Sequence, residues 1–386
     1  MPAITKRSDG RYETHVEMPN GKRKSVYGKT RKACREKAKA LEAKIALGVR
    51  VDVKRYPMTD LFDAWIENVA RKTYKALVFE QHERHIKTVW IPRLGACILQ
   101  DINADSIQPH INKLEETLAY NTVRNIRSTL SKVFDYAVQR RYIAYNPVKI
   151  IPLKRKGEQY IPRVFTFEEA LAFNSAVQLH EWGLSFQLAL RTGMRQGEIL
   201  GLAISDLNFE AETVAITGNL QWQRKPGESE RQAVRDTPKN TASTATITMP
   251  ASLVAPLRAH VARQRARFPQ NIYVFTTNEG EPINRYEYYA AYKKVLKEGN
   301  LPNIRFHDLR HTCASLLIDE GEDVKVVQEQ LRHKHVTTTL QIYAHVLPDR
   351  KRRAANKLDT LMQPSAVDPV VKSVVKSEEA PSADDA

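Results

Sequence analysis

The sequence has few cysteines and contains no long hydrophobic run. Its three cysteines, Cys34, Cys97 and Cys313, lie far apart, a spacing that fits neither a disulfide framework nor a paired-cysteine metal site and favours a reducing compartment. No apolar stretch approaches the ~20 residues that a membrane span requires. Residues 1–7 lack the apolar segment of a signal peptide, so we expect an intracellular protein.

Acidic residues are scarce relative to basic ones. The 386 residues include 60 Lys and Arg against 44 Asp and Glu, a formal net charge of +16. This surplus predicts a polyanionic partner, nucleic acid first and an anionic membrane surface second. Residues 363–386 have the opposite sign, with two lysines against five acids and no aromatic residue, and are expected to be a disordered acidic tail. At ~150 residues per domain, the length predicts two or three domains.

Residues 1–56, which hold sixteen basic and six acidic residues, are predicted to form three short strands and a helix. Turn-forming residues at 8–10 and 19–21 bracket a partly alternating stretch. Thr30 is a suitable N-cap for a helix over Arg31–Leu47 that Gly48 ends. The exposed sheet face suits insertion into a DNA groove, although a merely solvated basic face is the alternative. Its basic side chains are Arg11, Lys22 and Lys24.

Residues 57–153 are predicted to be all-helical. Thr59 or Asp60 can cap a helix over Leu61–Val69. A longer helix begins near Asn121 and carries one apolar stripe, which we expect in the core. Residues 151–157 then form an extended basic linker. The basic side chains of the longer helix either hold phosphates or face solvent, and these are Arg124, Arg127, Lys132 and Arg140.

Residues 160–362 are predicted to form a larger mixed unit. Thr166 and Glu169 form a capping box that opens a helix, and β structure is expected near Thr213–Gln221 and Thr244–Met249. The chain therefore has a multidomain α+β pattern. It consists of a small N-terminal three-stranded sheet plus helix, an all-α domain, and a mixed, mainly α domain with a small antiparallel sheet.

Six side chains in the last unit are suited to phosphate chemistry. The first, Arg195, lies between Gly193 and Gly197, so a tight bend can aim its guanidinium at a site. Two others are three residues apart and would share one face of a helix. Each residue alone also fits a structural role, and a histidine metal site is the weaker alternative because no Cys or carboxylate recurs at ligand spacing. In chain order the remaining five are Lys239, His307, Arg310, His333 and Tyr343.

In this order the six residues resemble the signature of the tyrosine recombinases, in particular the phage and integrative-element integrases. The family pattern is an arginine in T-G-x-R-x-G-E, a β-hairpin lysine, H-x-x-R, L-G-H and a later tyrosine. Arg332 stands where the family usually has the glycine of L-G-H, and Lys225 is a second candidate for the hairpin lysine. The resemblance covers nearly the whole chain. It implies an arm-type DNA-binding domain (1–56), a helical, SAM-like core-binding domain (57–153) and a catalytic domain (160–362).

The resemblance also assigns roles to these residues. A phosphodiester repels nucleophiles through its own charge, and the planar guanidinium groups of Arg195 and Arg310 can bind its oxygens bidentately. Tyr343 is the expected nucleophile that forms a covalent 3′-phosphotyrosine, and a phenol with a pKa near ~10 needs a proton acceptor. The other roles are His307 as base or phosphate donor, Lys239 as general acid for the 5′-oxygen, His333 as phosphate donor and Glu198 as the residue that orients neighbouring cations.

The implied activity is site-specific recombination of DNA through a Holliday junction, which integrates or excises a phage or mobile element. It uses no cofactor and no metal, and the sequence has no phosphate-binding G-x-x-x-x-G-K-[ST] loop. Expected partners are double-stranded DNA with core-type and arm-type attachment sites, other copies of the chain in a homotetramer, an excisionase and a host DNA-bending protein, but no membrane. The expected location is the bacterial cytoplasm, at the nucleoid.

Two alternatives remain open from the sequence. The first is a DNA-binding regulator that keeps the recombinase fold without cutting DNA. The second concerns residues 350–362, which are expected to form a basic amphipathic helix. This helix packs either on its own chain or on a neighbouring protomer.

Overall fold

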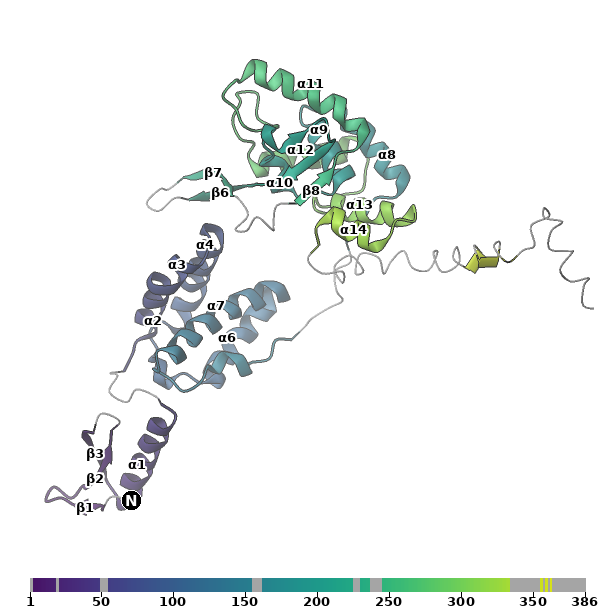
Figure 1. The fold of residues 1–386 in the computed structure, drawn as a ribbon. Coiled ribbons are helices and arrows are strands. Elements are labelled where there is room, and N and C mark those ends of the chain that lie inside the picture. The colour runs from purple at the N-terminus through teal and green to yellow at the C-terminus, as the bar shows by residue number, and fades with distance from the viewer. Residues whose placement is uncertain are drawn as a thin grey trace, which may run out of the picture. The chain divides into compact units, whose positions relative to one another are not determined.

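The computed structural model describes residues 3–18, 21–48, 55–154, 162–224, 230–236, 245–333, 355, 356, 358, 359 and 362. The chain divides into two compact units, residues 1–159 and 160–386, whose helices and strands are labelled in Figure 1. No helix in the described part of the chain has both the length and the apolar character needed to cross a bilayer.

The N-terminal part of the first unit is the predicted three-stranded sheet with one helix (Figure 1). Its elements are β1 (Thr5–Lys6), β2 (Tyr12–Glu17), β3 (Arg23–Gly28) and α1 (Arg31–Ala46). β2 pairs antiparallel with both other strands. Thr30 caps α1 by accepting a hydrogen bond from the Ala33 N–H at 3.1 Å. A Cβ at Gly28 would lie 2.4 Å from the backbone nitrogen of Cys34, so the helix packs directly on the sheet.

The basic side chains predicted for this sheet are exposed, but only Lys24 lies within a strand. Arg11 and Lys22 each precede a strand. The guanidinium of Arg11 is bound to the Asp9 carboxylate at 2.7 Å, which holds it at the turn. The expected basic residues therefore lie on β3 and in the turns that precede β2 and β3.

The rest of the first unit is all-helical, as predicted. In order the elements are α2 (Met58–Trp65), η1 (Ile66–Ala70), α3 (Arg71–Thr73), α4 (Ala76–Arg84), η2 (His85–Trp90), α5 (Ile91–Leu94), η3 (Leu99–Asp101), α6 (Ala104–Thr117), α7 (Tyr120–Gln139) and η4 (Pro147–Ile150). Four short segments depart from α-helical geometry. The segments η1 and η2 are π-helical, and η3 and η4 are 3₁₀ turns.

The start predicted for the first of these helices was wrong. α2 begins at Met58, so Thr59 and Asp60 lie inside it, and no side chain caps it. Pro57 precedes the helix with φ −62° and ψ 144° and forms an antiparallel bridge with Ile98. Through this bridge the Met58 N–H binds the carbonyl of Cys97 at 3.0 Å. A tertiary backbone contact thus satisfies one of the N–H groups that the first turn of the helix leaves without an intrahelical partner.

The apolar stripe of α7 lies in the core, as predicted, with Val123, Ile126, Leu130 and Phe134 all at most 3% exposed. Its basic residues do not share one role. Arg124 is exposed, whereas Arg127 donates to the carbonyl of Val148 at 2.8 Å and so holds η4 against the helix.

The second unit is a mixed, mainly helical domain with two small antiparallel sheets. β4, β5 and β8 form one sheet in that order, and β6 and β7 form a separate hairpin. Its elements are α8 (Phe167–Ala176), α9 (Gly183–Thr192), α10 (Gln196–Leu200), η5 (Ile204–Asp206), β4 (Leu207–Asn208), β5 (Thr213–Ile216), β6 (Asn219–Arg224), β7 (Arg231–Asp236), β8 (Ala245–Thr248), α11 (Ala251–Arg267), α12 (Arg285–Glu298), α13 (Asp308–Asp319) and α14 (Val324–Leu331).

The single strand predicted near Thr213–Gln221 is instead two strands that belong to different sheets. The break falls at Thr217 and Gly218, where the side chain of Arg235 from β7 crosses the chain. The Arg235 guanidinium donates to the Thr217 hydroxyl at 2.6 Å and to the Asp206 carboxylate at 2.7 Å. A Cβ at Gly218 would lie 2.4 Å from this guanidinium, so glycine is required for the crossing.

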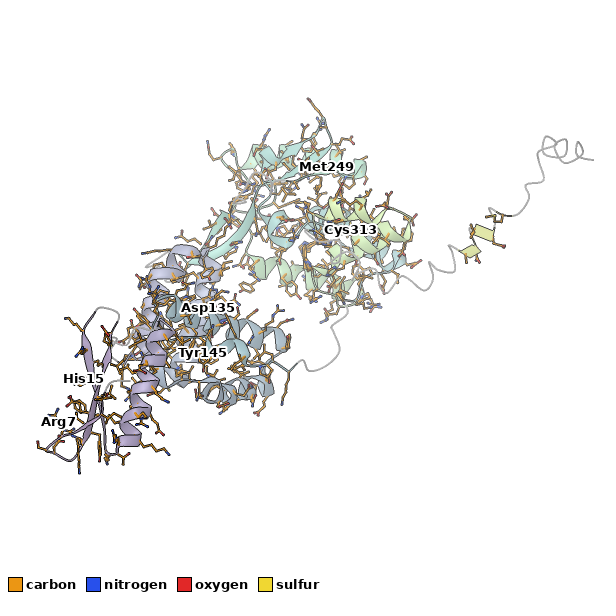
Figure 2. All side chains as sticks on the ribbon, turned by 60° about the horizontal axis from the view of Figure 1, so that its bottom comes forward. Arg7, His15, Asp135, Tyr145, Met249 and Cys313 are labelled. Carbon is orange, nitrogen blue, oxygen red and sulfur yellow. The ribbon has the colours of Figure 1, made fainter. Side chains whose placement is uncertain are left out.

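An aromatic cluster forms the core that supports the helices of this unit. Phe186 of α9 contacts Tyr288 and Tyr292 of α12 and also Phe306, with ring centroids 4.9–6.4 Å apart. The buried Tyr288 hydroxyl is paired with the Ser185 hydroxyl at 2.8 Å. Met249 belongs to the same core, whereas Cys313 belongs to a separate small cluster of buried residues; both are labelled in Figure 2.

Several predicted segments fall wholly or partly outside the described residues. The acidic tail, 363–386, and part of the linker, 155–157, are among them. Of the helix predicted for 350–362, the described residues 355, 356, 358, 359 and 362 are helical.

Candidate active site

The bend predicted around Arg195 joins α9 to α10. Gly193 ends α9 with φ +65°, and Arg195 then begins α10, its side chain 45% exposed. The Glu198 carboxylate accepts two hydrogen bonds from this residue, from the backbone N–H at 2.9 Å and from the guanidinium at 2.8 Å. Arg195 is therefore held at the surface of the unit with a fixed orientation.

Arg310 lies on α13 and is only 1% exposed. Its guanidinium donates to the carbonyl of Gly193 at 2.6 Å, to the carbonyl of Leu331, and to Nε2 of His333 at 3.3 Å. Burial, followed by the charges of Arg195 and Arg332, lowers the pKa of Arg310 to about 9. Arg310 still carries its charge at neutral pH and joins three segments: the bend after α9, α13 and the end of α14.

The histidines near this arginine are neutral at pH 7. Burial, then the charges of Arg310 and Arg195, lower the pKa of His333 to about 4, which agrees with its Nε2 accepting a hydrogen bond from Arg310. His307, at the start of α13, keeps an exposed edge, but packing around its ring and then Arg310 lower its pKa as well. His311 lies perpendicular to it with ring centroids 5.0 Å apart.

Glu198 is shared between two arginines. Oε1 accepts from the Arg195 guanidinium, and Oε2 accepts both from the Arg195 backbone N–H and from the Arg332 guanidinium at 2.8 Å. Burial acts to raise the pKa of Glu198, but the charge of Arg332 and the hydrogen bond from Arg195 outweigh it and lower that pKa. The carboxylate therefore stays ionised while its side chain is only 11% exposed.

Two glycines bring α10 against the β6–β7 hairpin. A Cβ at Gly197 would lie 1.8 Å from the Asn219 side chain, and one at Gly201 would lie 2.6 Å from the Leu220 nitrogen. Arg235 adds a hydrogen bond to the carbonyl of Gly201 at 2.7 Å. The hairpin that leads to residues 237–244 is thus fixed to the helix that Arg195 begins.

Of the six predicted residues, the structure brings Arg195, His307, Arg310 and His333 to one place in the second unit. Lys239 and Tyr343, together with the alternative Lys225, lie outside the described residues. No cluster of three or more potential metal ligands occurs among the residues that the structure describes.

Sequence reasoning missed two contacts of the site. The ion pair between Glu198 and Arg332 joins residues 134 positions apart, and the carbonyl of Gly193 receives the Arg310 guanidinium. The resemblance assigned Glu198 to orienting neighbouring cations, and the only sequence signal that Arg332 is one of them was its place at a glycine position of the family pattern.

Two family models match the chain. Residues 163–350 match the phage integrase family, and residues 58–152 match the phage integrase central domain. A tyrosine recombinase XerC-like protein of Caldanaerobacter subterraneus subsp. tengcongensis is 31% identical over 364 residues, covering 89% of this chain and 93% of that protein. The tyrosine recombinase XerD of Corynebacterium glutamicum is 34% identical over 313 residues, covering 76% and 95%.

Solved structures share the fold. The Tn1549 transposon integrase in complex with transposon right end DNA aligns with a TM-score of 0.66 at 23% identity, over 78% of this chain and 99% of that one. A lambda integrase tetramer bound to a Holliday junction aligns with a TM-score of 0.55 at 19% identity, over 88% and 94%.

A substitution at Gly193 tests whether the bend is as tightly built as these contacts indicate. In Gly193→Ala the new Cβ would lie 2.3 Å from Cδ2 of Leu331 at a φ of +65°. We expect a loss of about 2–4 kcal/mol in unfolding free energy, from left-handed strain plus overpacking, measured by calorimetry of the full chain. The control is Gly321→Ala, at φ +104° with open space around its Cβ. Equal losses in both variants would contradict the packing described here.

Proposed function

The chain belongs to the phage integrase family of tyrosine recombinases, and on that premise we propose how its residues carry out site-specific recombination. The enzyme breaks and rejoins DNA. The observation that carries the proposal is the placement of Arg195, Arg310, His307 and His333 together in the second unit, with Arg195 half exposed and firmly oriented.

The two arginines bind the scissile phosphate. A guanidinium has five N–H donors, and those of Arg310 make three hydrogen bonds to Gly193, Leu331 and His333, so two remain for phosphate oxygens. Arg195 supplies the exposed half of the clamp. Permanent charge held in place stabilises the additional negative charge of the transition state without reorganisation, an effect worth ~10²–10³ in rate per donor.

Tyr343 attacks the phosphorus in this proposal. The phenolic oxygen forms a 3′-phosphotyrosine, the bond to the 5′-oxygen breaks, and Lys239 protonates the leaving oxygen. His307 is neutral in the unbound protein and so can accept the phenolic proton or donate to the phosphate. The reverse attack by a 5′-hydroxyl rejoins the strands, and the ester conserves the bond energy.

The protein binds DNA and assembles into multimers on it. The relatives include a transposon integrase solved with transposon end DNA and a lambda integrase tetramer solved on a Holliday junction. We extend this to a homotetramer on two core-type sites, with an excisionase and a host bending protein as accessory partners at the nucleoid. The net charge of +16 supports a partner with many phosphates.

The domain assignments belong to the same proposal. Residues 1–56 bind arm-type sites through Lys24 and the turns around it, and residues 57–153 bind core-type DNA through exposed groups such as Arg124 on α7. A regulator that only binds DNA is not favoured, because it has no need for a nucleophile, a clamp and an acid in one chain.

The nucleophile is tested with nicked DNA. Duplexes that bind the chain are selected from a random pool and nicked at successive positions, so that cleavage releases a short fragment and traps the adduct. We expect a denaturant-stable protein–DNA adduct from the wild type and none from Tyr343→Phe. Duplex binding should persist in the variant. An adduct in Tyr343→Phe would show that another residue attacks.

The general acid is tested with a sulfur leaving group. Lys239→Ala should lower the adduct rate ~10²–10⁴-fold on ordinary DNA, and a 5′-bridging phosphorothiolate should restore it, because a thiolate leaves without a proton. Lys225→Ala is the matched control and should react normally on both substrates. If only Lys225→Ala lowers the adduct rate, and the phosphorothiolate restores that rate, then Lys225 and not Lys239 is the general acid.

The arm-binding domain is tested by deletion. Removal of residues 1–56 should abolish binding to flanking arm-type DNA and leave cleavage of the nicked core duplex largely intact. The binding that the deletion removes should depend steeply on salt. The logarithm of its binding constant should fall against the logarithm of salt concentration with a slope of about −0.9 per neutralised phosphate. Equal loss of core cleavage would contradict an independent arm-binding role.

A further inference from the structure

Arg332 occupies a backbone position that normally takes glycine. It follows the last residue of α14 with φ +57° and ψ +45°, in the left-handed region. Its N–H binds the carbonyl of Glu329 at 3.0 Å, and the next N–H, of His333, binds that of Gln328 at 3.0 Å. These two bonds form a Schellman motif, in which glycine is preferred because it lacks a Cβ. Arginine therefore adds backbone strain that glycine would avoid.

The side chain of Arg332 points back into the site instead of into solvent. Its guanidinium binds Glu198 at 2.8 Å, with the two side chains 12% and 11% exposed. Its Nε is buried with no hydrogen-bond partner among the described residues. Exposed ion pairs contribute little, but this pair is buried, and a buried guanidinium incurs a desolvation cost that a turn alone does not require.

The contact connects both halves of the phosphate site. Glu198 binds the guanidinium of Arg195 with one oxygen and that of Arg332 with the other. The residue after Arg332 is His333, which contacts Arg310. Hence one side chain links the start of α10 to the turn that presents His333.

The charges of the site also indicate a functional role for Arg332. The Glu198 carboxylate binds the guanidinium groups of Arg195 and Arg332, its charge also acts on Arg310, and burial lowers the pKa of His333 to about 4. The three guanidinium groups and the one carboxylate together carry a net charge of two positive units. A net positive charge favours an anionic group such as the scissile phosphate. Without Arg332 this net charge falls to one positive unit.

We propose that Arg332 is a positioning residue of the phosphate clamp, which holds Glu198 so that Arg195 and His333 face the same scissile phosphate. The inference rests on the proposed function, since it names what sets the geometry of the clamp. The group that the clamp binds is the scissile phosphodiester of duplex DNA.

The decisive variant is Arg332→Gly, because glycine suits the backbone and only the guanidinium is lost. We expect a thermal unfolding midpoint equal to or above that of the wild type, little change in duplex affinity, and an adduct rate at saturating nicked DNA ~10–100-fold lower, as for a misplaced clamp. The matched control is Asn300→Gly, which relieves a φ of +48° at an exposed residue after α12 and should react as the wild type.

Two further measurements separate positioning from structure. Arg332→Lys keeps the charge and should restore part of the rate. In Arg332→Gly the loss of a positive charge should raise the pKa of Glu198, so the acidic limb of the pH–rate profile should move to higher pH. Glu198→Gln should remove that shift, and the double variant should be no slower than the slower single one.

The outcomes are distinguishable. A wild-type chain that forms no adduct with any selected duplex would overturn the proposed function and this inference with it. A reactive wild type with an equally reactive Arg332→Gly would overturn the inference alone. A slower Arg332→Gly with a lowered unfolding midpoint and no rescue by lysine would assign Arg332 a structural role and also overturn it.

Discussion

A buried guanidinium must have its donors satisfied, and the way Arg310 meets this requirement organises the second unit. Two of its partners are backbone carbonyls, of Gly193 and Leu331, and the third is His333. The partners come from two segments, the bend after α9 and the end of α14, and Arg310 itself lies on α13, so the three hydrogen bonds form only when all three elements are in place. Folding of the domain therefore assembles the site that we propose binds the scissile phosphate.

The same charge determines the state of its neighbours. Burial and the nearby guanidinium groups lower the pKa values of His307 and His333, so positive charge in the site is permanent rather than dependent on histidine protonation. Glu198 binds the guanidinium groups of both Arg195 and Arg332, and it orients Arg195 without neutralising the site. A site with excess fixed positive charge and neutral histidines suits an anionic substrate that reacts with a phenol.

Local sequence patterns predicted much of this architecture. The glycines around Arg195 indicated its bend, the spacing of His307 and Arg310 placed both at the start of one helix, and the Thr166–Glu169 box is formed as expected, with the Glu169 N–H bound at 3.2 Å. Each of these features depends on residues within a turn or two of one another.

The features that were not predicted depend on distant contacts. Arg235 breaks the strand at Thr217 through hydrogen bonds from another strand, and the bridge between Pro57 and Ile98 starts α2 without a capping side chain. The Glu198–Arg332 pair likewise joins two turns that only the fold brings together. Periodicity and capping rules carry no information on such pairs.

The central claim is that a phenolic oxygen near the carboxyl end becomes esterified to DNA beside the arginine clamp. Its most direct measurement is mass spectrometry of the trapped adduct after digestion of both protein and DNA, to identify the residue that carries the remaining nucleotide. The account predicts a 3′-linked nucleotide on Tyr343 in the wild-type protein. A nucleotide on any other residue would contradict it.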